Sequence, residues 1–197
     1  MIGVGAIGRQ VALQLAAIGT GTLVLVDPDT VEPENLAAQG FLEADLNRFK
    51  NDAVKDLCWA INGGIRIAIR STKFKRSYLH EFGSGVVFCC VDSMEARGFI
   101  WRSCRGICDM FVDGRMAAEV CRILTVRNKK DHTYYEGTLF SDAEAFQGAC
   151  TAKTTLYCAN VAAGFMVAQL TKMFREIPYD KDVQVNILAN EMRFEDV

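Results

Sequence analysis

The chain has 197 residues, of which half are hydrophobic, and its formal net charge is −2. This length is enough for one domain with a sizeable core, and the slightly acidic balance argues against a nucleic-acid-binding surface. No apolar run reaches the ~20 residues of a membrane span and no secretory signal is visible, so we expect neither a nucleic acid nor a membrane as partner. Eight cysteines without a C-x-x-C pair favour a reducing, cytoplasmic setting.

The chain opens on a glycine turn. Gly3, Gly5 and Gly8 form G-V-G-A-I-G after a predicted strand over residues 1–4, which is so short that natural sequence upstream is expected to be missing. Gly3 permits the tight turn, Gly5 lets the backbone approach a phosphate, and Gly8 lets a helix pack against the strand. The following helix, expected over residues 9–19, would offer free N–H groups to an anion.

A predicted strand, Thr22–Val26, comes next and ends in Asp27-Pro28-Asp29. Asp27 lies where an acidic side chain usually accepts hydrogen bonds from an adenosine ribose. A glycine motif alone is weak evidence, because a plain turn between core elements has the same composition. The flanking strand, the helix and Asp27 together predict a nucleotide site.

The chain then alternates between helix and strand. We predict a helix over 51–61, a strand over 65–69, a polar connection or short helix over 73–82, a buried parallel strand over 85–91, a helix over 93–104 capped by Asp92 or Ser93, and a strand over 110–112 ended by Asp113-Gly114. This order predicts an α/β fold, doubly wound and Rossmann-like, with a mostly parallel sheet and antiparallel C-terminal strands. Its ligand should lie at the carboxyl ends of the strands, near Gly3, Asp27, Asp92 and Gly114.

The second half changes character. We predict a strand over 119–126, a charged turn over 127–131, an antiparallel strand over 134–140, a small, acidic and mobile segment over 141–149, a long helix over 154–174 and a final strand over 183–188. Small residues on the long helix (Ala159, Ala162, Ala163 and Gly164) indicate close packing against another helix, either within the chain or between two copies. Cys104 and Cys108, one helical turn apart, are core residues or metal ligands. Residues 1–197 are expected to form a single domain.

Four segments together resemble the ThiF/MoeB superfamily (the HesA/MoeB/ThiF family), which includes the activating enzymes for ubiquitin-like proteins. They are G-V-G-A-I-G, then L-V-D-P-D-T-V-E-P-E-N-L-A-A-Q with Lys50 downstream, then C-C-V-D-S-M-E-A-R around Asp92, and A-C-T-A-K-T-T before the long helix. The resemblance covers nearly the whole chain. It implies adenylation of a carboxylate with ATP and Mg²⁺, above all that of a small ubiquitin-like or sulfur-carrier β-grasp protein ending in glycine. It also implies a homodimer.

The resemblance assigns roles to particular residues. Lys50 would neutralise charge on the α-phosphate as the carboxylate attacks. Asp92 would hold Mg²⁺ against the triphosphate. From the residues alone, an N-cap for Asp92 and a solvated surface charge for Lys50 remain open. The nucleotide-binding set that we expect is Gly3, Gly5, Ala6, Gly8, Asp27, Asp29, Asn35, Gln39, Arg48 and Lys50.

Cys150 precedes the long helix, where some relatives carry a sulfur that receives the activated acyl group. A nearby helix N-terminus and Lys153 would favour its thiolate. The alternative is a small residue packed under a crossover loop. Cys89, Cys90 and Cys158 lie in apolar segments and are expected in the core.

The chain also departs from the family pattern. Ala38 stands where relatives have an arginine in N-L-x-R-Q, Ser93 replaces a frequent asparagine, and the arginine that relatives carry upstream of the first strand is absent. We expect Arg48 or Arg115 to compensate. The zinc-binding C-x-x-C pairs of many relatives are missing, so no structural zinc is expected.

Three functional classes therefore stay open. The first is the adenylating enzyme. The second is an NAD-dependent oxidoreductase, which the segment from Gly3 to Asp27 would serve equally well. Its general base is not evident, because His80 and His132 lie in polar segments expected at the surface. The third is a catalytically weak binding subunit of a heteromeric activating enzyme, which the missing arginines favour.

Overall fold

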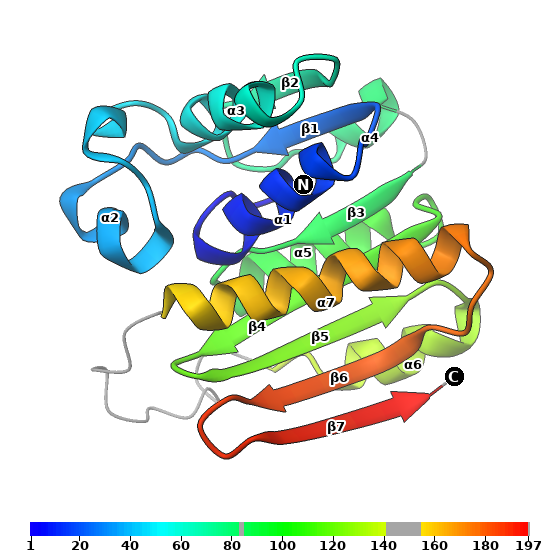
Figure 1. Ribbon diagram of the computed structural model, residues 1–197. Coiled ribbons are helices and arrows are strands. Elements are labelled where there is room, and N and C mark those ends of the chain that lie inside the picture. The colour runs from blue at the N-terminus through cyan, green and yellow to red at the C-terminus, as the bar shows by residue number, and fades with distance from the viewer. Residues whose placement is uncertain (83–84, 141–154, 197) are drawn as a thin grey trace.

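A computed structural model describes residues 1–82, 85–140 and 155–196, which form an α/β fold (Figure 1). The predicted alternation of helix and strand is confirmed. Its elements are α1 (Ala6–Ala17), β1 (Thr22–Val26), α2 (Pro33–Gln39), a 3₁₀ turn (Glu43–Asp45), α3 (Lys50–Ile61), β2 (Arg66–Arg70), α4 (Ser77–Phe82), β3 (Val86–Cys89), α5 (Met94–Cys104), β4 (Met110–Ala117), β5 (Val120–Val126), α6 (Lys129–Gly137), α7 (Leu156–Phe174), β6 (Asp180–Asn186) and β7 (Glu191–Asp196).

The strands form a parallel part and an antiparallel part. β1 pairs with β2 and β3 pairs with β4 in parallel, whereas the ladders β4–β5, β5–β6 and β6–β7 are antiparallel. Ile2 joins β1 to β3 through isolated parallel bridges to Val26 and Cys89, and this is what remains of the strand predicted over residues 1–4. The predicted combination of parallel strands with antiparallel C-terminal strands is therefore confirmed, and the antiparallel part extends over β4 to β7.

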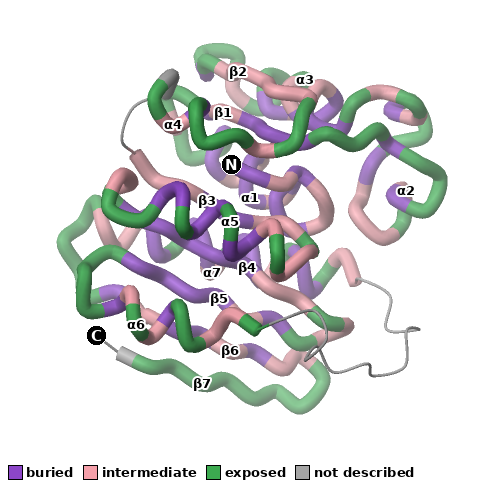
Figure 2. The backbone as a smooth tube through the Cα atoms, turned by 180° about the vertical axis from the view of Figure 1, so that it is seen from behind, coloured by how far each residue is buried: buried purple, intermediate pink, exposed green. Residues whose placement is uncertain are grey.

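Helices cover both sides of the strands. α1, α3 and α7 lie on the face toward the viewer in Figure 1, and α4, α5 and α6 lie on the face seen in Figure 2. Figure 2 also shows that buried backbone is concentrated in α1, β1, β4 and β5, between these two helical layers. The core consequently lies directly beneath the carboxyl ends of β1, β3 and β4.

Packing between α1 and α7 explains the small residues on the long helix. Ala159, Ala162 and Ala163 are fully buried within the chain. α7 also lies close to β4, since a Cβ on Gly114 would come within 2.5 Å of the Met166 sulfur. The alanines therefore serve packing inside the chain, while Gly164 is exposed.

The second half corrects three predictions. Residues 134–140 were predicted as a strand, yet Lys129–Gly137 is helix α6, because Asn128 and Asp131 form a capping box that starts a helix. The strand predicted to end before Asp113 is longer, since β4 continues through Asp113 to Ala117. The buried carboxylate of Asp113 can lie within the strand because it pairs with two arginines. The chain after α7 forms a hairpin of β6 and β7 instead of one final strand. The segment 141–149 lies outside the described residues.

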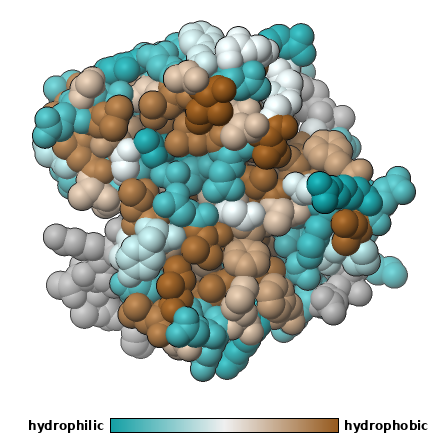
Figure 3. Space-filling model, in the orientation of Figure 1, coloured by the Kyte–Doolittle hydropathy of each residue, from teal (hydrophilic) through white to brown (hydrophobic). Residues whose placement is uncertain are grey.

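One face of the molecule exposes large hydrophobic side chains. Figure 3 shows hydrophobic residues both over the upper part of this face and over α7 and the strands below it. Phe174, Met192 and Phe194, from α7 and β7, are each about half exposed or more. Within the described residues, no helix has the length and apolar character needed to cross a membrane.

Candidate functional site

The glycine turn is shaped by close backbone contacts. Gly3 has a φ of +84°, which L side chains rarely adopt, and a Cβ on it would lie 2.7 Å from the Cys90 carbonyl. A Cβ on Gly8 would overlap the Gly3 carbonyl oxygen. These two glycines therefore let the turn between Ile2 and α1 pass directly against the end of β3.

Helix α1 begins with unused donors. Its N-cap, Gly5, has no side chain to bind them, and the first turn contains no acidic residue. Among the described residues, the N–H groups of Gly5, Ala6, Ile7 and Gly8 donate no hydrogen bond, whereas the Arg9 N–H bonds the Gly5 carbonyl. Such an N-terminus binds anions because its free N–H groups and its dipole both point at the ligand.

Asp27 connects the end of β1 to this turn. Its carboxylate accepts the Val4 N–H at 2.6 Å and the Asp29 N–H at 2.9 Å. Burial raises the pKa of Asp27, and the two N–H bonds oppose that rise. Each oxygen keeps acceptor capacity for a further donor such as a ribose hydroxyl.

Lys50 begins α3 and is buried, with only 7% of its surface exposed. The alternative of a solvated surface charge therefore does not hold. Its Nζ lies 3.2 Å from Asp29 Oδ2, a carboxylate whose side chain is 61% exposed. Next to it, the Asn51 amide donates to the Asp27 carbonyl at 3.3 Å, which fixes the start of α3 against the end of β1. Lys50 is thus a pre-positioned cation beside Asp27.

Two α2 residues of the predicted set differ in how they are used. Asn35 accepts the Glu32 N–H at 3.0 Å and so caps its own helix. Gln39 Oε1 is buried without a hydrogen-bond partner and lies 3.4 Å from the position of a Cβ on Gly5. Gln39 therefore faces the glycine turn.

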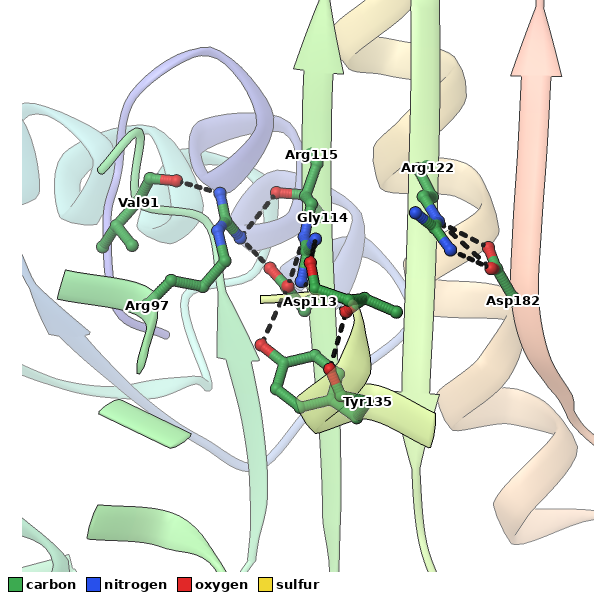
Figure 4. A network of polar contacts seen from close by, with 9 residues as sticks. Val91, Arg97, Asp113, Gly114, Arg115, Arg122, Tyr135 and Asp182 are labelled. Atoms are coloured by element: carbon green, nitrogen blue, oxygen red, sulfur yellow. Dashed lines mark hydrogen bonds and ion pairs between the residues drawn. The ribbon is translucent and has the colours of Figure 1, made fainter. Parts of the chain in front are cut away.

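Asp92 follows β3, and no hydrogen bond or ion pair joins its side chain to another of the described residues. The cap of α5 is Ser93, which accepts the Ala96 N–H at 3.2 Å, while Asp92 is exposed. Behind it, Arg97 donates to the carbonyls of Val91 and Gly114 and pairs with Asp113 (Figure 4). Arg97 thereby holds the ends of β3 and β4 together, and with them the loop that carries Asp92.

The donor set suits Mg²⁺ bound to a nucleotide. Among the described residues, no three His, Cys, Asp or Glu side chains cluster as a protein-built metal site. Mg²⁺ does not need one, because it is usually held by one or two carboxylates together with phosphates and water. The exposed carboxylate of Asp92, close to the α1 N-terminus, fits that role.

The two arginines expected to compensate for Ala38 already have protein partners. Arg48 bonds Asp45, Asp52 and Asp56 at 3.3, 3.1 and 2.5 Å. Arg115 bonds Asp113 at 2.8 Å, and its other nitrogens donate to the carbonyl and the hydroxyl of a single threonine, Thr138. Figure 4 shows the Arg115 guanidinium turned toward Asp113 and Tyr135.

The cysteines among the described residues are buried or partly buried, and one further cysteine lies outside those residues. Burial raises the pKa values of Cys89, Cys90 and Cys158, so these thiols stay protonated near neutral pH. Cys89 and Cys158 are fully buried, as expected for core residues, whereas Cys90 is only partly buried. Cys104 is also buried, at the end of α5. Cys150 lies outside the described residues.

A cavity of about 590 Å³ lies away from these groups, between the N-terminal ends of β1 and β3. Its lining includes Ile2, Leu23, Val87 and Phe174, and no charged side chain contributes to it. A triphosphate needs cations or N–H donors. The polar groups at the opposite strand ends, and not this cavity, therefore form the candidate nucleotide site.

Three buried polar residues of the site were not predicted from the sequence. Asn51 follows Lys50, Arg97 lies on the buried face of α5, and Arg9 follows Gly8. All three could have been found in the same way. Each is a polar residue on the apolar face of a predicted helix, in or beside a motif.

Known proteins resemble this chain in sequence. A sequence model of the ThiF family matches residues 1–197. The chain is 33% identical over 107 residues to the sulfur carrier protein ThiS adenylyltransferase of Escherichia coli (strain K12), which covers 53% of this chain and 43% of that protein. It is 30% identical over 108 residues to the SAMP-activating enzyme E1 of Haloferax volcanii, which covers 53% of this chain and 40% of that protein. These matches span less than half of either relative.

The fold is also found in a solved structure. Escherichia coli MccB, crystallised with ATP, superposes with a TM-score of 0.75 at 18% identity, over 99% of this chain and 62% of MccB. At that identity the superposition demonstrates a shared fold.

Proposed function

Because the chain belongs to the ThiF family, we propose that it activates a carboxylate by adenylation, consuming ATP and releasing pyrophosphate. The observation that carries the proposal is the placement of Lys50. This buried lysine lies beside Asp29 at the end of β1, where Asp27 holds the turn that leads to the free N–H groups of α1. A dehydrogenase would need the glycine turn and Asp27 but would not need Lys50.

The residues divide the work between holding the nucleotide and stabilising charge. Asp27 accepts the ribose hydroxyls, and the N–H groups at the start of α1 bind a phosphate. Lys50 stabilises the negative charge that grows on the α-phosphate as the carboxylate oxygen attacks, since its ammonium is already in place. Asp92 holds Mg²⁺, which when bound neutralises phosphate charge.

The expected acyl partner is a small protein or peptide with a free carboxylate. The names of two relatives refer to activation of ThiS and of SAMP, and MccB has been crystallised with MccA. These names support a β-grasp protein ending in glycine, or a peptide, as the substrate class for this chain.

The test is an exchange of labelled pyrophosphate into ATP, measured with purified chain, Mg²⁺ and candidate partners. Adenylation predicts exchange that requires both Mg²⁺ and a partner with an intact C-terminal carboxylate. A partner with an amidated C-terminus is the matched control, because it keeps every other contact. Exchange with the amidated partner, or no exchange with any C-terminal glycine protein or peptide, would contradict the proposal.

We propose that Cys150 accepts the acyl group: its thiolate attacks the acyl adenylate, a thioester forms, and AMP leaves. Cys150→Ala should leave pyrophosphate exchange intact but abolish a thioester between chain and partner, detected as a band sensitive to reductant. Cys158→Ala is the matched control, since that thiol is fully buried. A thioester that survives Cys150→Ala would exclude this role.

One observation favours a second candidate function, a catalytically weak binding subunit. Ala38 replaces the family arginine, and Arg48 and Arg115 are bound by protein groups. Such a subunit would bind the nucleotide or partner without supporting exchange. In such a subunit, the exposed hydrophobic residues of α7 and β7 would contact a different protein. In the adenylating enzyme, they would contact a second copy of this chain. Sedimentation of the chain alone distinguishes a homodimer from a monomer.

A further inference from the structure

Arg9 is a buried cation without an anionic partner among the described residues. It follows Gly8 in α1, is only 8% exposed, and its Nε has no hydrogen bond. No hydrogen bond or ion pair of its side chain joins it to any other described residue. The guanidinium lies over the ring of Phe41, whose centroid is 5.6 Å from the guanidinium carbon.

This arrangement is unfavourable in the isolated chain. Desolvation lowers the pKa of Arg9, opposed by the charge of Asp45, whose own carboxylate already accepts the Leu42 N–H and bonds Arg48. The position also places a positive charge in the first turns of α1, where the helix dipole disfavours it. Buried charges in proteins are normally paired, so an unpaired one indicates a missing anion.

The surroundings of Arg9 place that anion at the glycine turn. Side chains on a helix tilt toward its N-terminus, which here carries the free N–H groups. Arg9 Nη1 lies 3.2 Å from the position of a Cβ on Gly40, and the preceding residue, Gln39, faces Gly5. The guanidinium is therefore packed beside the part of α2 that borders the turn.

We propose that Arg9 binds a phosphate of the nucleotide and replaces the arginine that Ala38 removes from α2. The proposal rests on the nucleotide site of the proposed function. Arg9 lies on α1 and the family arginine on α2, so the cation reaches the phosphates from the neighbouring helix. The guanidinium pairs with phosphate oxygens through two parallel N–H bonds, a geometry that lysine does not offer.

The experiment compares wild type with Arg9→Met, Arg9→Lys and the control Arg66→Met, which removes an exposed arginine of β2. ATP, pyrophosphate and adenosine are titrated by calorimetry, and the ligand-free proteins are unfolded thermally. Arg9→Met should weaken binding of ATP and pyrophosphate about 10- to 100-fold, with adenosine binding unchanged. Arg9→Lys should recover part of the loss, and Arg66→Met should change nothing.

Thermal unfolding separates a ligand-binding role from a structural one. Removing an unpaired buried charge should leave the ligand-free melting temperature of Arg9→Met unchanged or higher. A lower melting temperature with unchanged ATP and pyrophosphate affinity would show that Arg9 acts by packing on Phe41 and would overturn the proposal. So would a wild type that binds neither ligand.

The outcomes also separate this proposal from the proposed function. Loss of pyrophosphate binding in Arg9→Met, in a chain that never exchanges pyrophosphate, would support Arg9 and reject adenylation. Full exchange activity in Arg9→Met would support adenylation and reject Arg9.

Discussion

Two regions of this molecule treat buried charge in opposite ways. Around β4, β5 and β6, buried charges have opposite charges as partners: Asp113 pairs with Arg97 and Arg115, and Asp182 accepts Arg122 at 2.6 Å (Figure 4), although Arg97 Nε and Asp113 Oδ1 form no hydrogen bond. Around the glycine turn, donors and acceptors are left open, namely the α1 N–H groups, Gln39 Oε1 and Arg9 Nε. Closed networks stabilise a fold, and open ones indicate where a ligand completes the set.

The largest effect should come from opening the closed network. Asp113→Ala leaves Arg97 and Arg115 buried without their shared carboxylate, and should lower the free energy of unfolding by about 3–5 kcal/mol. Chemical denaturation measures this loss. Asp109→Ala, at an exposed carboxylate, should change it by less than about 0.5 kcal/mol. Equal stability of the two variants would mean that the network does not hold β4 in the core.

Around the glycine turn, substitutions should lower the rate of pyrophosphate exchange and not the free energy of unfolding. Lys50→Met should reduce pyrophosphate exchange about 100- to 1,000-fold, because a fixed cation at the α-phosphate is removed. The matched control is Lys55→Met on the same helix, whose ammonium pairs with Asp52 and lies 5.2 Å from the Trp59 ring centroid. It should leave exchange unchanged. A Lys50→Met protein that unfolds more easily but exchanges normally would place Lys50 among the structural charges.

Asp92 belongs to both regions. Its exposed carboxylate is available to a ligand, while the loop that carries it is held by Arg97 and Asp113. Asp92→Asn should weaken ATP binding about 10- to 100-fold in Mg²⁺ and have no effect without the metal. Calorimetry with Mg²⁺ or a chelator measures both values. Glu95→Gln, at an exposed acid in the first turn of α5, is the control. An equal loss in chelator would point to a role other than metal binding.

The smallest effect on the free energy of unfolding should come from Cys58, whose buried thiol is neutral and therefore needs no charged partner. Burial raises the pKa of Cys58 to about 11 from an ordinary value near 9. The unfolded chain therefore ionises first as pH rises, and the thiol's contribution to stability falls between pH 9 and 11, by up to about 1.4 kcal/mol per pH unit. The difference in unfolding free energy between wild type and Cys58→Ala should accordingly shrink from pH 8 to pH 10. A difference that stays constant would contradict the shift.

Much of the parallel half was predictable because its signals are local. The glycines of G-V-G-A-I-G are needed where the turn passes close to the end of a strand. The residues around Cys89 are apolar because their strand is buried. The same motifs placed Asp27, Lys50 and Asp92 at strand and helix ends, where the structure has them. The antiparallel half was less predictable. Residues 134–140 combine aromatic and polar residues that suit a strand, yet the capping box at Asn128 and Asp131 decides for a helix.

By itself, the sequence determined where nucleotide-binding motifs lie and that helices and strands alternate, because glycine turns, apolar runs and acidic strand ends act over a few residues. Only the tertiary structure decided which charges are available. From the sequence, Arg48 and Arg115 were the cations expected to bind phosphate, and Arg9 was not predicted. The fold surrounds the first with three carboxylates, pairs the second with Asp113, and leaves the third buried and unpaired beside the glycine turn. Pairing of charges depends on residues far apart in the chain, so it exists only once the elements have packed.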